Sequence, residues 1–384
     1  MDENWFVKKT FWSKFRNAYL KDANFKKFWQ KTNKDKFDKD LVDLVNYYIS
    51  SKSFEFSSRF WNILNIAHLN QIKQFGIENF ASTVAMNYFT TIAYDDKKIQ
   101  NILNYIVNAN INPSEYSNEL FKRQINIDFT HSVNHNIILN LLYTYIKHNN
   151  YNHYIKRLEK NNFLIDKVPN IKIDNLLLTQ DKLNSILEFI NIKKILDNIE
   201  SSSFNILEIG AGSGRTTETI ISLLDQDKKI KYVIVDIPPA IYINFLRMKN
   251  NYPNKKIALA LNIDSQESLK KMYDENDIIL ILPHQLNYFL NKDFDITIAI
   301  DCLHEMDKKI IKFYMDTVHR ISSHLYYKVW NKTHVPYAFN NFLSAKDKKG
   351  YQIKSSWKLI LDEKSTFPSN YSEFGYKIIK DKVK

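Results

Sequence analysis

The chain has 384 residues, of which 44% are hydrophobic and 14% aromatic. This composition supplies a folded core and excludes a disordered chain, a fibrous repeat and a disulfide-stapled miniprotein. The formal net charge is +12, but the lysines are scattered among acidic residues along the whole chain. Because a nucleic-acid binder usually concentrates such an excess in one stripe, we expect no nucleic-acid partner, while an anionic small substrate or an anionic membrane stays open.

The sequence predicts a cytoplasmic protein. Cys302 is the single cysteine, so no disulfide can form within the chain, which fits a reducing compartment. The densest apolar runs, residues 278–282 and 296–300, have strand length and are far shorter than the ~20 residues that cross a bilayer. The first five residues lack the basic start and apolar stretch of a signal peptide.

Residues 1–195 are predicted to form a helical domain or lid, and residues 196–384 a second domain. The first of these contains a single glycine, Gly76, and turn breakers at Pro113 and Pro169. Apolar residues recur there at helical spacing. Examples are Leu41, Leu44, Val45 and Tyr48; Trp61, Leu64, Ile72 and Phe75; and Ile138, Leu141, Leu142, Tyr145 and Ile146.

The first forty residues combine ten aromatic residues with ten lysines and Arg16. We favour an ordinary helix that packs its aromatic residues on the lid. The alternative is a basic amphipathic helix on an anionic membrane, which would make the protein a peripheral membrane protein. The aromatic residues are Trp5, Phe6, Phe11, Trp12, Phe15, Tyr19, Phe25, Phe28, Trp29 and Phe37.

Three of the six glycines fall within five residues, at Gly210, Gly212 and Gly214. The run before them (204–209) predicts a buried strand, and residues 216–224 predict a helix. A strand, a glycine turn and a helix together bring backbone N–H groups and a helix N-terminus close to a ligand.

The glycine spacing indicates which ligand is expected. A dinucleotide motif is G-x-G-x-x-G, but here Arg215 stands in the place of the third glycine. With Glu208 two residues before the first glycine, the E-x-G-x-G-x-G pattern resembles the first motif of class I S-adenosylmethionine-dependent methyltransferases. A zwitterionic amino-acid tail needs backbone room and a nearby carboxylate. The cofactor-binding residues implied by this motif are Glu208, Gly210, Ala211, Gly212, Gly214 and Arg215.

Asp236 ends a predicted strand at 231–236, 22 residues after Gly214. An acid at this place in α/β nucleotide folds accepts hydrogen bonds from ribose hydroxyls, in NAD enzymes as well. The alternative is that Asp236 caps the helix after Pro238 and Pro239.

Further apolar runs at 277–283, 294–301, 325–330, 357–362 and 374–379 predict the remaining strands. They complete a Rossmann-like α/β fold, which is a seven-stranded sheet with helices on both faces. One of these helices is predicted at 307–323. In such sheets ligands lie beyond the carboxyl ends of the strands. The residues that follow strands, and are therefore expected around one cleft, are Asp236, His284, Gln285, Asp301, His304, Glu305 and Trp330.

Five sequence blocks in this order resemble the bacterial sugar O-methyltransferase family: 208–216, 235–240, 282–286, 303–306 and Trp330. The resemblance covers roughly residues 200 to 380, and the family's usual serine before Leu-His-Glu-Met is Cys302 here. It implies transfer of a methyl group from S-adenosylmethionine to a hydroxyl of a sugar, in a nucleotide sugar or a surface-polysaccharide glycan.

Methyl transfer to a hydroxyl requires in-line alignment and removal of the hydroxyl proton. His304 is the expected general base, oriented by Glu305 or Asp301. Alternatively, His304 caps the following helix or fills a polar gap, and Glu305 is a helix N-terminal acid. His284 is expected to border the adenine, with Ile237, Gln285 and Asp301 also among the cofactor-binding residues. Trp330 and Tyr337 are expected to stack on a sugar, or else to be core aromatics.

Three other functions stay open at this point. A small-molecule methyltransferase of the same fold could use a metal held by Asp301 and Glu305, but no third acid stands nearby, so we predict no metal site. A non-catalytic cofactor-binding scaffold is the second. An NAD-dependent oxidoreductase is the third, and Arg215 disfavours it.

Overall fold

The computed structural model describes residues 24–79, 129–161, 170–224, 228–290, 293–333, 343–367 and 371–379. The helices before the large sheet are α2 (Phe25–Lys31), α3 (Lys39–Ser50), α4 (Arg59–Phe75), α8 (Phe129–His148), α9 (Asn152–Arg157) and α10 (Gln180–Leu196), with short 3-10 turns at Ser53–Phe56 (η1) and Ile77–Asn79 (η2). A two-stranded hairpin, β1 (Asn170–Ile173) and β2 (Leu176–Thr179), precedes α10.

Short polar side chains start several of these helices. The Asn24 side chain accepts a hydrogen bond from the backbone N–H of Lys27, and the Ser58 side chain accepts one from that of Trp61. The helical spacing predicted for this region is confirmed in α3, α4 and α8. The predicted apolar residues that are buried there are Leu41, Leu44, Val45, Tyr48, Trp61, Leu64, Ile72, Leu141, Leu142 and Ile146.

Eight strands form the large sheet, in the order β11-β12-β8-β7-β3-β4-β6-β5. All neighbours pair in parallel except β12, which runs antiparallel to β11 and to β8. The strands are β3 (Ser203–Ile209), β4 (Lys229–Val235), β5 (Ile257–Leu259), β6 (Ile278–Ile281), β7 (Ile296–Ile300), β8 (His324–Trp330), β11 (Lys358–Lys364) and β12 (Tyr371–Lys377). A separate two-stranded pair joins β9 (Lys332–Thr333) to β10 (Leu343–Ser344).

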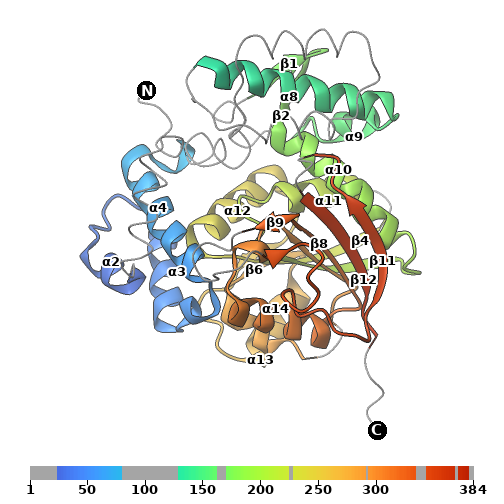
Figure 1. Ribbon diagram of the computed structural model, residues 1–384. Coiled ribbons are helices and arrows are strands. Elements are labelled where there is room, and N and C mark those ends of the chain that lie inside the picture. The colour runs from blue at the N-terminus through green and yellow to red at the C-terminus, as the bar shows by residue number, and fades with distance from the viewer. Residues whose placement is uncertain are drawn as a thin grey trace.

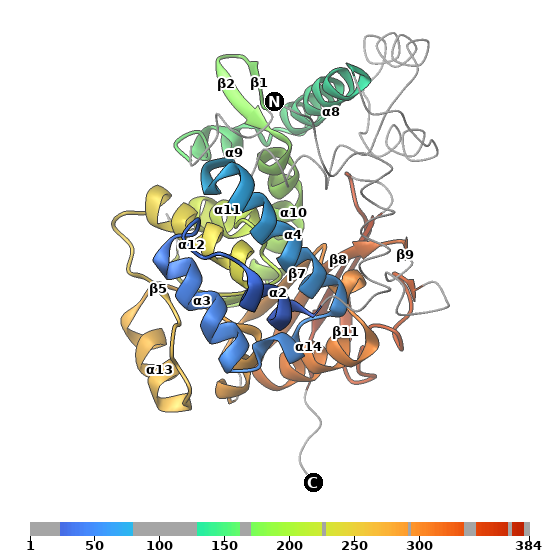
Figure 2. The ribbon, with the colours of Figure 1, turned by 90° about the vertical axis from the view of Figure 1, so that its left-hand side faces the viewer.

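Helices cover both faces of this sheet, with α10 and α11 on one face and α13 and α14 on the other (Figures 1 and 2). The helices that follow β3 are α11 (Arg215–Leu224), α12 (Pro238–Asn251), α13 (Gln266–Glu275) and α14 (Lys308–Ile321), with 3-10 turns η4 (Pro283–Tyr288) and η5 (Leu303–Glu305). The predicted Rossmann-like fold class is confirmed. The short edge strand β5 is an eighth strand that the sequence analysis did not predict.

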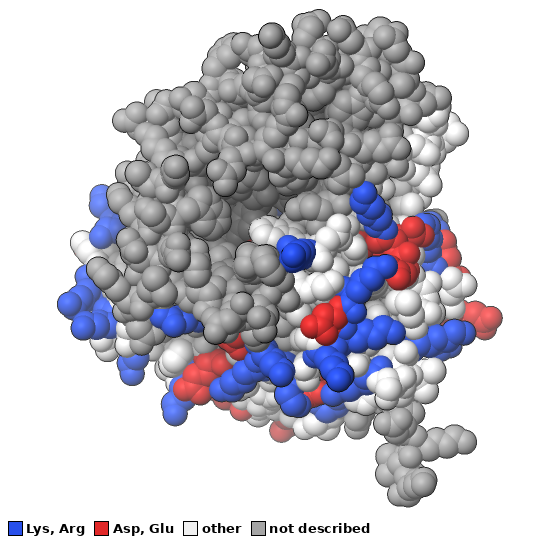
Figure 3. Space-filling view, in the orientation of Figure 1, with Lys and Arg blue, Asp and Glu red and all other residues white. Residues whose placement is uncertain are grey.

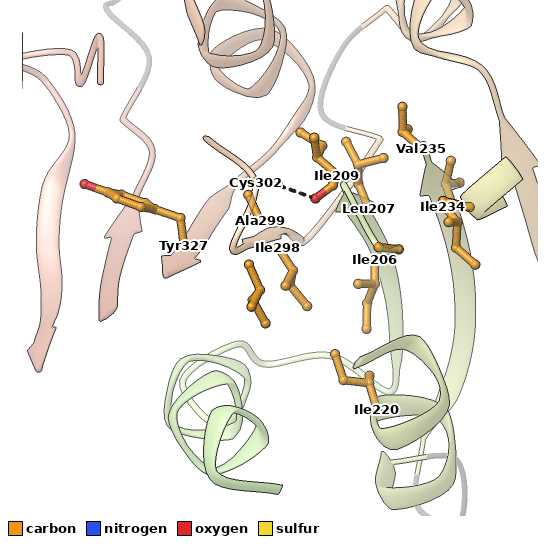
Figure 4. Packing of buried hydrophobic residues seen from close by; sticks show 14 of the residues in the cluster. Ile206, Leu207, Ile209, Ile220, Ile234, Val235, Ile298, Ala299, Cys302 and Tyr327 are labelled. Carbon is orange, nitrogen blue, oxygen red and sulfur yellow. Dashed lines mark hydrogen bonds between the residues drawn. The ribbon is translucent and has the colours of Figure 1, made fainter. Parts of the chain in front are cut away.

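The core of the molecule lies between the central strands and their covering helices. Apolar side chains of β3, β4 and β7 fill this layer, with Ile220 of α11 packed from the helix side (Figure 4). The thiol of Cys302 donates a hydrogen bond to the carbonyl of Ile209 over 3.2 Å. Strands buried on both faces explain why the apolar runs in the sequence are continuous rather than alternating.

Helices α2, α3 and α4 lie across one side of the sheet domain, in front of it in Figure 2. Tyr47 of α3 reaches Asp264, and Trp61 of α4 reaches Glu305. Helix α10 packs on the sheet itself, where Asn191 donates to Glu373 over 2.6 Å. The domain boundary at residues 195 and 196 stays a prediction, and it falls at the end of this helix.

The basic aromatic segment predicted at the start of the chain is described only from residue 24 onward. Phe25 and Trp29 are buried, and Phe28 and Phe37 pack against the same core. The other six aromatic residues of the segment lie outside the described residues. On the face in Figure 3, lysines and arginines lie among aspartates and glutamates. None of the helices in the described part of the chain has the length and hydropathy needed to traverse a bilayer.

Candidate active site

The glycine turn follows β3 and leads into α11. Gly210, Gly212 and Gly214 have φ angles of 71°, 57° and 89°, a left-handed region that other residues rarely adopt. A Cβ atom placed on Gly210 would lie 2.5 Å from the Cβ of Cys302, and one on Gly214 would lie 2.4 Å from Oδ1 of Asn244. A Cβ on Gly212 would meet no described residue within 4 Å. The middle of the turn therefore borders open space, as a ligand-binding turn requires.

Asp236, at the end of β4, holds the glycine turn in place. Its carboxylate accepts hydrogen bonds from the backbone N–H of Gly212 over 2.6 Å and from that of Ile237 over 2.7 Å. Burial raises the pKa of Asp236 to about 7, although these two bonds act in the opposite direction. Ile237 occupies the N-cap position of α12, so the alternative role of Asp236 as that cap is wrong.

Glu208 faces the interior of the protein. It is 2% exposed and accepts hydrogen bonds from Thr217 over 2.6 Å and from Tyr232 over 2.8 Å. Burial raises the pKa of Glu208, while these bonds lower it. Glu208 thus ties β3 to α11 and β4. Ala211, in the turn itself, is also buried.

Arg215 forms a buried ion cluster with groups from three other elements. Its guanidinium lies 2.5 Å from Glu188 of α10 and 3.4 Å from Asp301, which follows β7. The ammonium group of Lys328 lies 2.8 Å from the same Glu188. Burial raises the pKa of Glu188, but the two cations outweigh it and the net shift is downward. Arg215 therefore binds protein carboxylates across the sheet edge.

Asp301 stands at the same edge with an unusual backbone. Its φ angle is 57°, and its Oδ1 atom is buried without a hydrogen-bond partner among the described residues. Burial raises the pKa of Asp301 to about 6, against the influence of Lys328 and Arg215. One oxygen of this carboxylate thus has no donor in the part of the chain that the structure describes.

His304 lies in η5, packed between two aromatic rings. Its ring stacks on Trp330 with centroids 4.9 Å apart and meets Tyr371 edge-on at 6.0 Å. Burial lowers the pKa of His304 to about 3, so the imidazole is neutral at physiological pH. The Nδ1 atom has no hydrogen-bond partner among the described residues. The predicted orientation of His304 by Asp301 or Glu305 is therefore not formed at Nδ1.

Glu305 instead bonds to a residue that the sequence analysis did not assign to the site. The indole N–H of Trp61 in α4 donates to its carboxylate over 3.0 Å. Burial raises the pKa of Glu305 to about 8, and this hydrogen bond acts in the opposite direction. Trp61 belongs to an ordinary apolar helix face in the sequence, so no local pattern marks it as a site residue.

His284 and Gln285 lie at the end of β6, against Tyr47 of α3. The amide group of Gln285 accepts from the backbone of Leu282 and donates to two backbone carbonyls and to Tyr47. It therefore closes the loop rather than facing open space. His284 meets Tyr47 edge-on at 5.6 Å, and its Nδ1 atom is buried without a partner. Burial lowers the pKa of His284 to about 4.

The structure thus brings the residues that follow β3, β4, β6, β7 and β8 to one edge of the sheet. Trp330 is 38% exposed, with His304 on its inner side. Tyr337, the other predicted sugar contact, lies outside the described residues. No group of three potential metal ligands occurs among the residues that the structure describes.

No family model and no curated protein matches the chain. Among solved structures, it is similar to the CurJ carbon methyltransferase, with 13% identity, a TM-score of 0.36 and coverage of 88% of this chain and 99% of that one. An S-adenosylmethionine-dependent methyltransferase from Aquifex aeolicus is 11% identical with a TM-score of 0.35, and the match covers 50% of this chain and 89% of that one. Magnesium protoporphyrin IX methyltransferase from Synechocystis PCC 6803, with bound S-adenosylmethionine, is 10% identical with a TM-score of 0.33, and the match covers 52% of this chain and 82% of that one. These identities are too low to indicate an activity.

Proposed function

We propose that the protein is an S-adenosylmethionine-dependent O-methyltransferase that acts on a hydroxyl of a sugar, in a nucleotide sugar or a surface-polysaccharide glycan. The observation that carries the proposal is the open space at Gly212, beside Asp236 and at the same sheet edge as the His304–Trp330 stack. This arrangement supports a site for a nucleoside ligand next to a site for an acceptor.

The residues present fit this cofactor. The backbone at Gly212 leaves room for it, and Asp236 stands at the strand end where α/β nucleotide folds place the carboxylate for ribose hydroxyls. The unpartnered Oδ1 of Asp301 is an acceptor for an ammonium group, and the unpartnered Nδ1 of His284 suits a polar atom of a base. Arg215 is engaged by Glu188 and Asp301, which argues against a pyrophosphate at this turn.

When bound, S-adenosylmethionine supplies an activated methyl group, so the chain has to position the acceptor and take up its proton. His304 is neutral, and its buried Nδ1 atom, to which no described residue forms a hydrogen bond, is the candidate acceptor of the hydroxyl proton. Its low pKa keeps the ring unprotonated but makes it a weaker base than an ordinary histidine. Trp330 holds the ring of His304 by stacking and presents its exposed part to an acceptor.

Calorimetric titration tests the cofactor. We expect binding of S-adenosylhomocysteine and no binding of NAD. Binding of NAD alone would end the proposal.

A variant pair tests the role of His304. We expect His304→Ala to bind S-adenosylhomocysteine like the parent and to lose methylation of nucleotide sugars or glycans, followed by mass spectrometry. His319→Ala is the matched control, because His319 also stacks on a tryptophan, Trp357, at 6.0 Å but lies in α14. Unchanged turnover in His304→Ala would remove this residue from the mechanism.

A further inference from the structure

One side chain from the N-terminal helices contacts both halves of the proposed site. A Cβ atom on Gly210 would lie 2.8 Å from Cη2 of Trp61, so the indole ring covers that side of the glycine turn. At the other end of the ring, the indole N–H donates to Glu305, the residue after His304. Trp61 is 6% exposed, so this contact is buried.

The backbone of Trp61 is fixed by the start of α4. The hydroxyl of Ser58 accepts from the N–H of Trp61 over 3.1 Å, and Ser58 is itself buried. The hydroxyl of Tyr48 donates to Asn62 and accepts from Ser57, and these two residues lie on either side of this turn. The backbone that carries the indole is therefore fixed by contacts at the start of α4 and by Tyr48 of α3.

The surroundings of Glu305 make this hydrogen bond important. Within the described residues, Glu305 forms no ion pair, and the groups that face it are acids or weak acids: Asp236, Asp301, Cys302 and Tyr371. A charge-assisted hydrogen bond from an N–H favours the ionised form of a carboxyl group in such a place.

We infer that Trp61 is a positioning residue of the site, which fixes the side chain of Glu305, the residue after His304, and closes the glycine turn on the side of Gly210. Helix α4 then completes a site that the sheet domain alone leaves open. This inference rests on the proposed function, because it assigns the two contacts of Trp61 to a cofactor turn and an acceptor site.

Substitutions of two tryptophans separate this role from ordinary packing. Trp29 is the matched control, because it is buried in α2 and its indole N–H donates to Asn46 over 2.8 Å. We expect Trp61→Ala to weaken binding of S-adenosylhomocysteine by about tenfold or more, and Trp29→Ala to leave it unchanged. Binding by the parent with equal binding by Trp61→Ala would overturn the inference, whereas a parent that does not bind at all would overturn the proposed function.

A milder pair guards against a variant that does not fold. Trp61→Phe keeps an aromatic ring and removes only the N–H donor, as Trp29→Phe does in α2. Without that donor Glu305 ionises at higher pH, so the pH profile of thermal stability should reach its plateau at higher pH in Trp61→Phe alone. The shift should vanish in a Glu305→Gln background. A profile that stays in place while stability falls equally in both variants would show that Trp61 only packs.

Discussion

Alanine substitutions at two glycines of the same turn should separate stability from binding. Gly210→Ala should lower mainly the free energy of unfolding, and Gly212→Ala should lower mainly the affinity for the ligand. Both residues have left-handed φ angles, which cost a substituted residue about 1–2 kcal/mol. Alanine recovers about 0.4–1 kcal/mol by restricting the unfolded chain. At Gly212 the new methyl group meets nothing, so the net destabilisation should be about 1 kcal/mol.

At Gly210 the new methyl group would overlap Cys302 and Trp61, which adds about 1–3 kcal/mol of overpacking. Gly210→Ala should therefore lose about 2–4 kcal/mol of unfolding free energy. The affinity for S-adenosylhomocysteine should fall at Gly212, because there the new methyl group enters the space assigned to the ligand. We expect Gly212→Ala to bind about tenfold more weakly or worse while it stays folded.

Urea unfolding followed by circular dichroism measures the first quantity, and calorimetry at a temperature where both variants are folded measures the second. If Gly212→Ala binds the cofactor product like the parent, the open space beside this residue is not the ligand site. If it unfolds as easily as Gly210→Ala, the space is not open.

Three further expectations concern the carboxyl groups and the ion cluster. The stability of the ligand-free protein should fall as pH rises from about 4.5 to about 8, because the folded state keeps a proton on Glu305 that the unfolded state has already released. Thermal unfolding should show a smaller fall in Glu305→Gln. An equal fall in that variant would contradict the assignment of the raised pKa to Glu305. Lys328→Met should lower the free energy of unfolding in urea by about 3 kcal/mol, since it leaves Glu188 buried with Arg215 alone. A cost near zero would mean that the ion pair of Lys328 and Glu188 is not buried. Asp236→Ala should weaken binding of S-adenosylhomocysteine by about 1–3 kcal/mol in calorimetry, and unchanged affinity would remove Asp236 from the site.

The sequence predicted those parts of the fold that rest on local patterns. Continuous apolar runs marked the buried parallel strands, and the glycine spacing marked the turn after β3. Strand β5 was missed because three residues, Ile257–Leu259, are too short to show any periodicity. The position of α3 and α4 could not be predicted, since Trp61 and Glu305 are 244 residues apart in the chain.

The direction of a side chain was harder to predict than its place after a strand. Glu208 and Gln285 both stand where the motifs put cofactor contacts, yet both use their polar atoms on the protein itself. In a parallel strand successive side chains point to opposite faces. A residue can therefore lie beside a ligand-binding turn and still point into the core, and only the packing of α11 and β4 decides this for Glu208.

Charge compensation at the sheet edge is uneven, and this unevenness bears on the ligand. Glu188 has two cations against it and a lowered pKa, whereas Asp236 and Glu305 have no ion pair among the described residues and raised pKa values. Asp301 shares Arg215 with Glu188 and keeps one oxygen without a partner. A ligand that carries positive charge would favour the ionised form of these three carboxyl groups and recover the cost of their burial. The electrostatics of the edge thus favour a cationic ligand, such as a sulfonium with an ammonium group, over a pyrophosphate.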